Sequence, residues 1–147
     1  MATMLLNQDT RAIVQGITGK VGQAQTHWMV KAGTLLIAGV APGRGGNQVE
    51  GLPVYDTVAE AIQKERANAS AIFVPAASAR AAAFEAIEAG LRLIVIVTEH
   101  IPVRDTMEIK LRARISGATV IGPIRIKLSF MVSQSHELRH QLGMVLG

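Results

Sequence analysis

A short glycine-rich segment near the N-terminus has the composition of an anion-binding loop. Residues 16–22 read Gly-Ile-Thr-Gly-Lys-Val-Gly; an apolar run precedes them and a helix-forming run follows them. In a strand–loop–helix unit, glycines let the backbone approach a ligand closely, and the first N–H groups of the helix point at a phosphate. We therefore predict a phosphate-binding loop at residues 16–22.

The glycine spacing separates this loop from two common nucleotide-binding motifs. Gly16, Gly19 and Gly22 follow the pattern G-x-x-G-x-x-G, whereas the dinucleotide fingerprint is G-x-G-x-x-G. A P-loop needs Gly-Lys followed by Ser or Thr, but Lys20 is followed by Val21. A tight turn without a ligand is the alternative interpretation of the segment.

A second candidate ligand-binding position lies at the end of the apolar run of residues 35–41. Rossmann proteins that bind NAD carry Asp or Glu there, to bind the ribose 2′-hydroxyl. Residues 40–44 instead read Val-Ala-Pro-Gly-Arg, without a carboxylate. An arginine at this place suits a phosphate on the ribose, as in NADP or the 3′-phosphate of coenzyme A (CoA). For Arg44 the alternative is a solvated loop cation.

The elements that must position these residues alternate between short apolar strands and helices. We expect strands at 12–15, 35–41, 52–55, 71–74, 91–97 and 119–121, and helices at 20–32, from 57, at 79–89 and at 105–116. This alternation predicts a single α/β domain, with a Rossmann-like open, mostly parallel sheet and helices on both faces.

Local signals set the expected boundaries of these elements. Glycines at 33, 90 and 117 stand where three of the helices should end. Thr57 and Glu60 form a capping-box pattern, and Asp105 can cap the last of these helices. Pro53 marks 52–55 as an edge strand, because proline lacks a ladder donor.

The composition argues against several classes of protein. The chain has 147 residues, 49% hydrophobic residues and no apolar run near the roughly 18 residues of a spanning helix. The net charge is +4, but the basic residues are scattered and aromatics make up only 3%, so we expect no nucleic-acid partner. The absence of cysteine excludes disulfides, and the N-terminus has no signal-peptide pattern, so we expect a cytoplasmic protein without a membrane partner.

The histidines give no pattern for catalysis or for a metal. His27 lies inside a predicted helix, where an ordinary surface or partly buried histidine is the favoured interpretation. His136 and His140 are four residues apart on a predicted helix, but no third ligand accompanies them. We predict neither a catalytic residue nor a metal site.

Beyond these separate signals, several blocks of the sequence resemble one family over residues 5–123. Residues 16–22 are similar to the G-[FI]-T-G-x-x-G loop of succinate–CoA ligase (succinyl-CoA synthetase) alpha subunits. Further blocks resemble, in the same order, that family's G-V-[TS]-P-G-K-G-G (residues 39–46), G-L-P-V (51–54), Y-V-P-A (73–76), I-T-E-G-I-P (97–102) and I-G-P (121–123). Several such blocks in register are a specific signal.

The resemblance implies a CoA site and the residues that form it. Thr18, Gly19, Lys20 and Val21 would line the CoA phosphates, and Arg44 would replace the family's lysine. Val97, Thr98 and Glu99 would line the nucleotide or the pantetheine, although Glu99 could instead cap a helix. The full set of predicted cofactor-binding residues is Gly16, Thr18, Gly19, Lys20, Val21, Gly22, Pro42, Arg44, Val74, Pro75, Val97, Thr98 and Glu99.

The sequence departs from the family at a few places. Ala77-Ser78 stands where the family often has Pro-Phe, and His100 stands where it has glycine. The resemblance stops after Pro123, as a divergent tail, a truncated domain or a shifted reading frame would each produce. We treat residues 124–147 as a divergent tail of unknown role, with a strand near 124–130 and a helix near 136–146 as candidates.

The domains and subunits of this family limit the function that we expect for this chain alone. The family's alpha subunits carry a second domain with a phosphorylated histidine, act in the tricarboxylic acid cycle and pair with an ATP-grasp beta subunit. This chain is too short for that second domain. We therefore expect a CoA-binding domain that is not catalytic alone, with a beta subunit as partner. Self-association through a surface left by the absent domain is a further expectation. A stand-alone CoA-binding protein and an NAD(P)-binding Rossmann protein are the alternatives.

Overall fold

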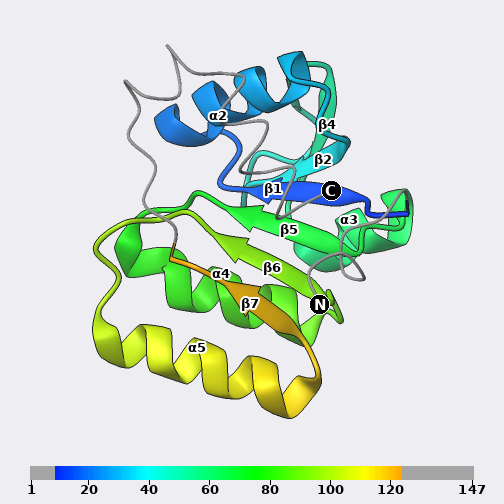
Figure 1. The fold of residues 1–147 in the computed structure, drawn as a ribbon. Helices are drawn as coiled ribbons and strands as arrows, with labels where there is room; N and C mark the ends of the chain where they lie inside the picture. The colour runs from blue at the N-terminus through cyan, green and yellow to red at the C-terminus, as the bar shows by residue number, and fades with distance from the viewer. Residues whose placement is uncertain (1–8, 124–147) are drawn as a thin grey trace.

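The computed structural model describes residues 9–123 as one sheet flanked by helices (Figure 1). The strands are β1 (Ala12–Gln15), β2 (Leu36–Val40), β3 (Gln48–Val49), β4 (Leu52–Tyr55), β5 (Ala69–Ile72), β6 (Leu93–Ile96) and β7 (Thr119–Ile121). The helices are α2 (Lys20–Lys31), α3 (Val58–Glu65), α4 (Ala76–Glu88) and α5 (Val103–Ser116).

The order of the strands across the sheet is β3-β4-β2-β1-β5-β6-β7. All neighbouring pairs are parallel except β3 with β4. From β1 the chain moves to β2 and then to the outer β3–β4 hairpin on one side, and it returns to β5 on the other side of β1. The direction of winding therefore changes at β1, and ligands of open α/β sheets bind at such a switch point, at the carboxyl ends of the strands.

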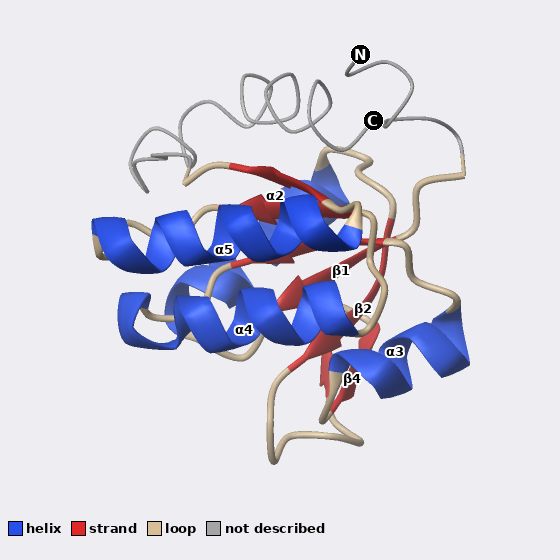
Figure 2. Cartoon of the chain, turned by 90° about the horizontal axis from the view of Figure 1, so that it is seen from below, coloured by secondary structure: helices blue, strands red, loops and turns tan. Residues whose placement is uncertain are grey.

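Helices cover both faces of the sheet, as the sequence predicted. Helix α2 lies on one face, and α3, α4 and α5 lie together on the other, which faces the viewer in Figure 2. The side chains divide accordingly into two buried clusters: Met29 of α2 belongs to one, while Ala61 of α3, Ala83 of α4 and Ile109 of α5 belong to the other. Every residue of β1, β5 and β6 is buried. Burial on two faces explains why these strands have little polar alternation.

Helices α4 and α5 are joined by a network of charged side chains. Arg80 of α4 contacts Glu108 of α5, with 2.6 Å between Nη2 and Oε2, and Arg112 of α5 contacts Glu88 of α4 at 2.9 Å. The ring of Phe84 lies between the guanidinium groups of Arg80 and Arg112, 4.5 and 4.6 Å from its centroid. The hydrogen bond from Arg80 lowers the pKa of the Glu108 carboxyl. These contacts fix the orientation of α5 on α4.

The prediction that residues 52–55 form an edge strand is wrong. Strand β4 lies between β2 and β3, and β3 forms the edge on this side. β3 and β4 are joined by a two-residue loop, Glu50-Gly51, in which both residues have positive φ (52° and 78°), as tight hairpins require. Pro53 pairs with Gln48 of β3, and the pairing with β2 begins only at Val54, so the missing N–H of the proline breaks no bond to β2.

Two helices begin earlier than predicted because each follows a proline. Helix α4 begins at Ala76 after Pro75, and α5 begins at Val103 after Pro102. Asp105 is therefore not a cap but lies in the first turn of α5, where its carboxylate meets the positive end of the helix dipole. The capping hydrogen bond of Thr57 is confirmed, because its hydroxyl accepts the N–H of Glu60 at 3.1 Å.

The predicted helix ends are confirmed by the backbone. Gly33, Gly90 and Gly117 follow α2, α4 and α5 with φ of 86°, 97° and 78°, the left-handed region that favours glycine. The predicted strand at 124–130 and helix at 136–146, with His136 and His140, lie outside the described residues. Within residues 9–123, no helix has the length and apolar character needed to cross a bilayer.

Candidate functional site

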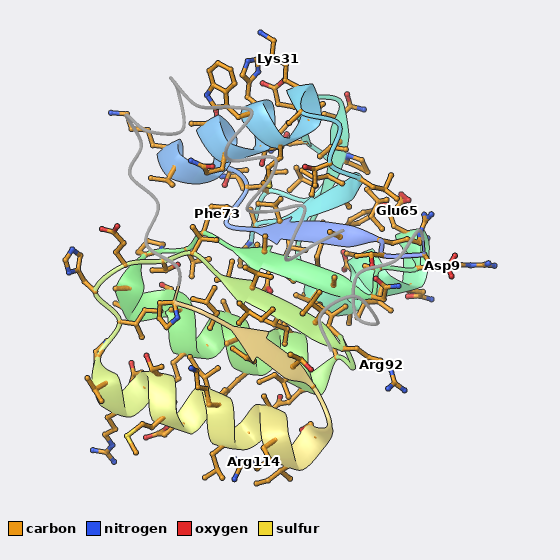
Figure 3. The ribbon with its side chains drawn as sticks, in the orientation of Figure 1. Asp9, Lys31, Glu65, Phe73, Arg92 and Arg114 are labelled. Carbon is orange, nitrogen blue, oxygen red and sulfur yellow. The ribbon has the colours of Figure 1, made fainter. Side chains whose placement is uncertain are left out.

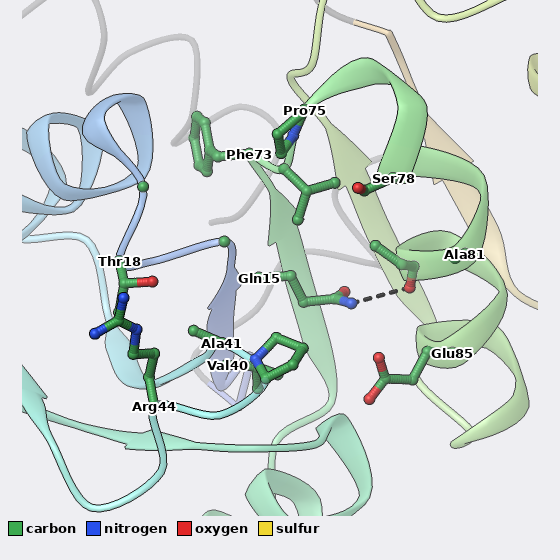
Figure 4. Close-up of a pocket in the computed structure, with 15 residues that line it drawn as sticks. Gln15, Thr18, Val40, Ala41, Arg44, Phe73, Pro75, Ser78, Ala81 and Glu85 are labelled. Carbon is green, nitrogen blue, oxygen red and sulfur yellow. Dashed lines mark hydrogen bonds between the residues drawn. The ribbon is translucent and has the colours of Figure 1, made fainter.

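A cleft of about 400 Å³ opens at the carboxyl ends of β1, β2 and β5, where the winding of the sheet changes direction (Figure 4). Its lining comes from four segments: Gln15, Gly16, Thr18 and Gly19; Val40, Ala41, Pro42 and Arg44; Phe73, Val74 and Pro75; and Ser78, Ala81, Ala82 and Glu85 of α4. The volume suits a small-molecule ligand. The cleft is therefore the candidate binding site.

The loop between β1 and α2 presents backbone donors to this cleft. Gly16 has a φ of 84°, its N–H donates to the Val40 carbonyl at 2.9 Å, and the N–H of Gly19 donates to Gly16 O at 3.2 Å. Gly19 precedes α2 and offers no side chain to cap it. The N–H groups of Lys20, Val21 and Gly22 belong to the first turn, which has no intrahelical acceptors. Together with the helix dipole, this turn has the chemistry to bind an anion.

Two glycines allow this loop to pack closely against its neighbours. A Cβ at Gly22 would overlap the carbonyl oxygen of Gly16 and lie 2.9 Å from its carbon. A Cβ at Gly39 of β2 would lie 2.8 Å from the Cβ of Ile17, a fully buried loop residue, and closer still to that side chain's methyl groups. Gly22 thus holds the start of α2 against the loop, and Gly39 makes room for the side chain that anchors the loop to the core.

We expect the Gly39→Ala substitution to destabilise the protein by about 1–3 kcal/mol, the usual range for overpacking a dense core. Because the clash is with Ile17, adding Ile17→Ala should recover part of the loss, so that the two changes cost less together than their sum. Urea unfolding of the four variants of this cycle measures the coupling. Strictly additive free energies of unfolding would contradict the proposed contact.

Arg44 and Thr18 lie at the polar end of the cleft (Figure 4). Both also line an adjoining pocket of about 400 Å³, whose other residues are Gln23, Asn47, Gln48 and Val49. The N–H of Arg44 donates to the Ala41 carbonyl at 3.0 Å, so the loop turns back on itself, and the guanidinium lies beside Thr18 in the loop before α2 (Figure 4). Arginine and the helix N-terminus together favour a ligand with more than one phosphate group.

The opposite wall of the cleft is held by two polar side chains. Buried Gln15 donates through Nε2 to the Ala82 carbonyl of α4 at 2.9 Å and accepts through Oε1 from Ser70 at 2.7 Å. Glu85 of α4 accepts the N–H of Val58, the first residue of α3, at 2.7 Å. These bonds fix α4 relative to β1 and α3. Most of the remaining wall is apolar, which suits a flat ring system.

The predicted site residues fall into three groups in the structure. Those that line the cleft are Gly16, Thr18, Gly19, Pro42, Arg44, Val74 and Pro75. Lys20, Val21 and Gly22 form the first turn of α2 beside it. Val97, Thr98 and Glu99 follow β6, one strand farther along the sheet, and do not line the cleft.

The segment after β6 is tied to the cleft only indirectly. Val97 is buried in the core, and the hydroxyl of Thr98 donates to the Val74 carbonyl at 2.7 Å. Glu99 is partly exposed, and its carboxylate lies 3.7 Å from the ring of His100. Since Val74 does line the cleft, Thr98 supports one of its walls. Direct ligand contact by Val97, Thr98 and Glu99 stays a prediction.

Sequence reasoning missed the wall built by α4 and the adjoining pocket. Gln15 carried a signal, because a long polar side chain at the end of an apolar strand needs partners or a ligand. Ala81, Ala82 and Glu85 carried none, since they look like ordinary helix residues. Within residues 9–123, no three His, Asp or Glu side chains are arranged to hold a metal ion.

Comparison with known families gives a match that covers most of the chain. Residues 7–100 match the CoA binding domain family. This segment contains β1 to β6 and every residue that lines the cleft.

Two curated relatives are both named succinate–CoA ligase subunit alpha. The succinate–CoA ligase [ADP-forming] subunit alpha of Methanothermobacter thermautotrophicus is 52% identical over 120 residues, which are 82% of this chain and 41% of that protein. The subunit alpha 2 of Archaeoglobus fulgidus is 48% identical over 120 residues, 82% of this chain and 42% of that protein. The chain thus spans about two fifths of the length of these relatives.

Among solved structures, the fold is similar to part of the ATP citrate lyase from Methanothrix soehngenii, determined in complex with citrate and coenzyme A. The TM-score is 0.65 at 24% identity, over 84% of this chain and 22% of that chain. At this level of identity the likeness supports the Rossmann-like fold.

Proposed function

The chain belongs to the CoA-binding domain family, whose ligand is coenzyme A, and from this premise we propose that it is the CoA-binding part of an acid–CoA ligase. The family match over residues 7–100 and the relatives named succinate–CoA ligase subunit alpha support this proposal. The structural observation that carries it is the uncapped start of α2, which opens beside Arg44 into a cleft with an apolar wall.

The cleft suggests how CoA would bind. The diphosphate would accept the N–H groups of Lys20, Val21 and Gly22 and the hydroxyl of Thr18, since all four donors surround the start of α2. The 3′-phosphate would lie at Arg44 in the polar end of the cleft.

The rest of the ligand would use the apolar parts of the site. The adenine ring would lie on the apolar wall, against Pro42 and Val74. The pantetheine arm would then run from the phosphates along the carboxyl ends of the strands towards Val97, Thr98 and Glu99. Gly16 and Pro75 would shape the cleft without donating a side-chain hydrogen bond.

In the reaction of a succinate–CoA ligase, succinate, CoA and a nucleoside triphosphate give succinyl-CoA, the diphosphate and phosphate. The proposed role of this chain is limited to holding CoA, because the described lining of the cleft contains no histidine that could carry a phosphoryl group. The phosphoryl-transfer steps would then belong to further parts of the ligase, including an ATP-grasp beta subunit as partner. We further propose that the chain works in the cytoplasm.

Calorimetric titration with CoA, dephospho-CoA, NAD and NADP tests the ligand assignment. We expect selective binding of CoA and weaker binding of dephospho-CoA, because the latter lacks the 3′-phosphate. The Arg44→Ala variant should lose about 10- to 150-fold in CoA affinity but almost nothing in dephospho-CoA affinity, since a charge-assisted contact contributes about 1.5–3 kcal/mol.

Arg44→Lys is the matched control, because it keeps the charge but replaces the planar fork by a single ammonium group. It should fall between the wild type and Arg44→Ala. Equal losses for CoA and dephospho-CoA would contradict the assignment of Arg44 to the 3′-phosphate. Preferential binding of NAD or NADP by the folded protein would overturn the proposed function.

A further inference from the structure

Helix α5 exposes a row of large apolar side chains along its whole length. Val103, Met107, Leu111 and Ile115 are 76%, 66%, 59% and 75% exposed. These four residues, at a spacing of four, are named here the α5 ridge. Single exposed apolar residues are common on protein surfaces, but a contiguous row marks a surface for interaction.

The α5 ridge points away from the core of the domain. Ile109 and Ala113, the buried residues of α5, lie on the opposite side of the helix and pack against the sheet. The ion pairs of Glu108 with Arg80 and of Arg112 with Glu88 hold the helix in this orientation. The ridge therefore contributes nothing to the core, and the contacts with α4 present it to solvent on a fixed support.

The spacing of the ridge fits a helix better than a flat surface. Four residues advance a helix by about 40° beyond one turn, so the row winds around α5 by about 120° from Val103 to Ile115. A lipid surface would meet only part of such a row, and the ridge has no aromatic residue of the kind that anchors interfacial helices. Rows of i, i+4 side chains instead pack into the equivalent rows of another helix, at a crossing angle of about −50°.

The charges beside the ridge distinguish between possible helical partners. Arg104, Lys110, Arg112 and Arg114 are exposed on α5, and Arg114 lies on the side turned away from the sheet (Figure 3). Glu108 pairs with Arg104 and with Arg80 of α4, and Glu88 of α4 pairs with Arg112. Among the described residues, Lys110 and Arg114 are therefore the cations of this set that have no ion pair within 4 Å. A second copy of the chain would place these cations against their equivalents, whereas an acidic partner would be attracted.

We propose that the α5 ridge is the docking surface for a helix of a partner protein that carries apolar side chains every four residues and acidic residues beside them. The surface is formed by α5 alone, apart from the cleft, so this interaction does not depend on the ligand proposed for the cleft.

Two synthetic peptides serve as probes of the full chain. Each is a fluorescent helical peptide of about 18 residues, long enough to follow the ridge, with leucine at every fourth position. One has glutamate beside the leucines and the other has lysine. In fluorescence anisotropy, the acidic peptide should bind at least about 10-fold more tightly than the basic one, and Leu111→Gln should weaken its binding by about 10-fold or more.

Leu35→Gln is the matched control, because Leu35 is a comparably exposed leucine (53%) outside the ridge and the cleft. It should bind the acidic peptide like the wild type. Circular dichroism establishes that both variants keep their helices. Absence of binding by the wild type, equal binding of both peptides, or equal effects of the two substitutions would overturn the proposal.

Two further measurements distinguish other occupants of the ridge. Light scattering of the wild type should give a monomer, in contrast to the self-association expected from the sequence. A dimer that Leu111→Gln dissociates would assign the ridge to a second copy and overturn the proposal. Sedimentation with phosphatidylglycerol vesicles should leave the protein in the supernatant. Co-sedimentation that Leu111→Gln abolishes would assign the ridge to a lipid surface and overturn the proposal.

Discussion

Replacing Gly19 by valine is expected to reduce CoA affinity by about 100-fold or more while changing the free energy of unfolding by no more than about 1 kcal/mol. Gly19 lines the cleft, and its φ of −71° is accessible to any L-residue. The nearest heavy atom to a Cβ at this position is the Gly16 oxygen at 3.4 Å, an acceptable contact. The branched side chain would therefore extend into the space where a phosphate must approach the first turn of α2.

Calorimetry with CoA and urea unfolding measure the two quantities separately. Gly19→Ala provides the graded control, because one methyl group should leave more of the phosphate site open and cost less affinity. If Gly19→Val binds CoA as the wild type does, the ligand phosphates do not lie at the start of α2. If Gly19→Val unfolds, Gly19 is required for the fold, and the CoA affinity of Gly19→Ala then serves as the test.

Gly22→Ala, three residues farther on, should have the opposite pattern of effects and act mainly on stability. Its Cβ would overlap the backbone oxygen of Gly16, and backbone atoms cannot move aside as a flexible side chain can. Relief requires α2 to shift away from the loop, so we expect a loss of about 3 kcal/mol or more, the upper part of the range for overpacking. CoA affinity should fall as well, because the first turn of α2 moves with the helix.

The measurement is urea unfolding, with Gly43→Ala as the control for the loss of a glycine. Gly43 has a φ of 79°, and no heavy atom lies within 4 Å of a Cβ placed on it, so its replacement meets backbone strain of about 1–2 kcal/mol but no clash. A Gly22→Ala variant as stable as the wild type would show that the loop and α2 are less tightly packed than the structure has them.

Most of the fold was predictable because its central strands are buried on both faces. Continuous apolar runs such as residues 93–97, which lie between two helices, are typical of parallel sheets. Strand β3 was not predictable in the same way. It has only two residues, and its hairpin loop is Glu50-Gly51, not one of the Asn-Gly or Asp-Gly pairs that signal a tight hairpin.

The candidate site was predictable in the segments that carry local sequence signals for phosphate binding. Glycine spacing at residues 16–22 and the arginine at 44 are local features, and the structure brings both to one cleft. The far wall depends on which face of α4 meets β1, a property of packing that no local pattern encodes. Ala82 is an example: its carbonyl meets Gln15, 67 residues away in the chain.

The assignment of residues 97–99 to the site depends on the resemblance and not on the geometry of the cleft. Their assignment to the site came from the family pattern alone, and the structure places them at the next strand, outside the lining of the cleft. A ligand as long as CoA reaches past one strand, so the position is compatible with contact by the pantetheine arm. Protection or chemical-shift changes at these residues on CoA addition would decide the point.

The position of the cleft between two halves of the sheet has a consequence for the native-state ensemble. Its polar end belongs to the loops after β1 and β2, whereas much of its apolar wall belongs to the segment after β5 and to α4. A ligand that contacts both halves cannot bind to any partly open form in which they have separated. Bound CoA would therefore suppress sub-global opening, and the amide hydrogens shared by β1 and β5 would exchange more slowly even where they lie far from the ligand.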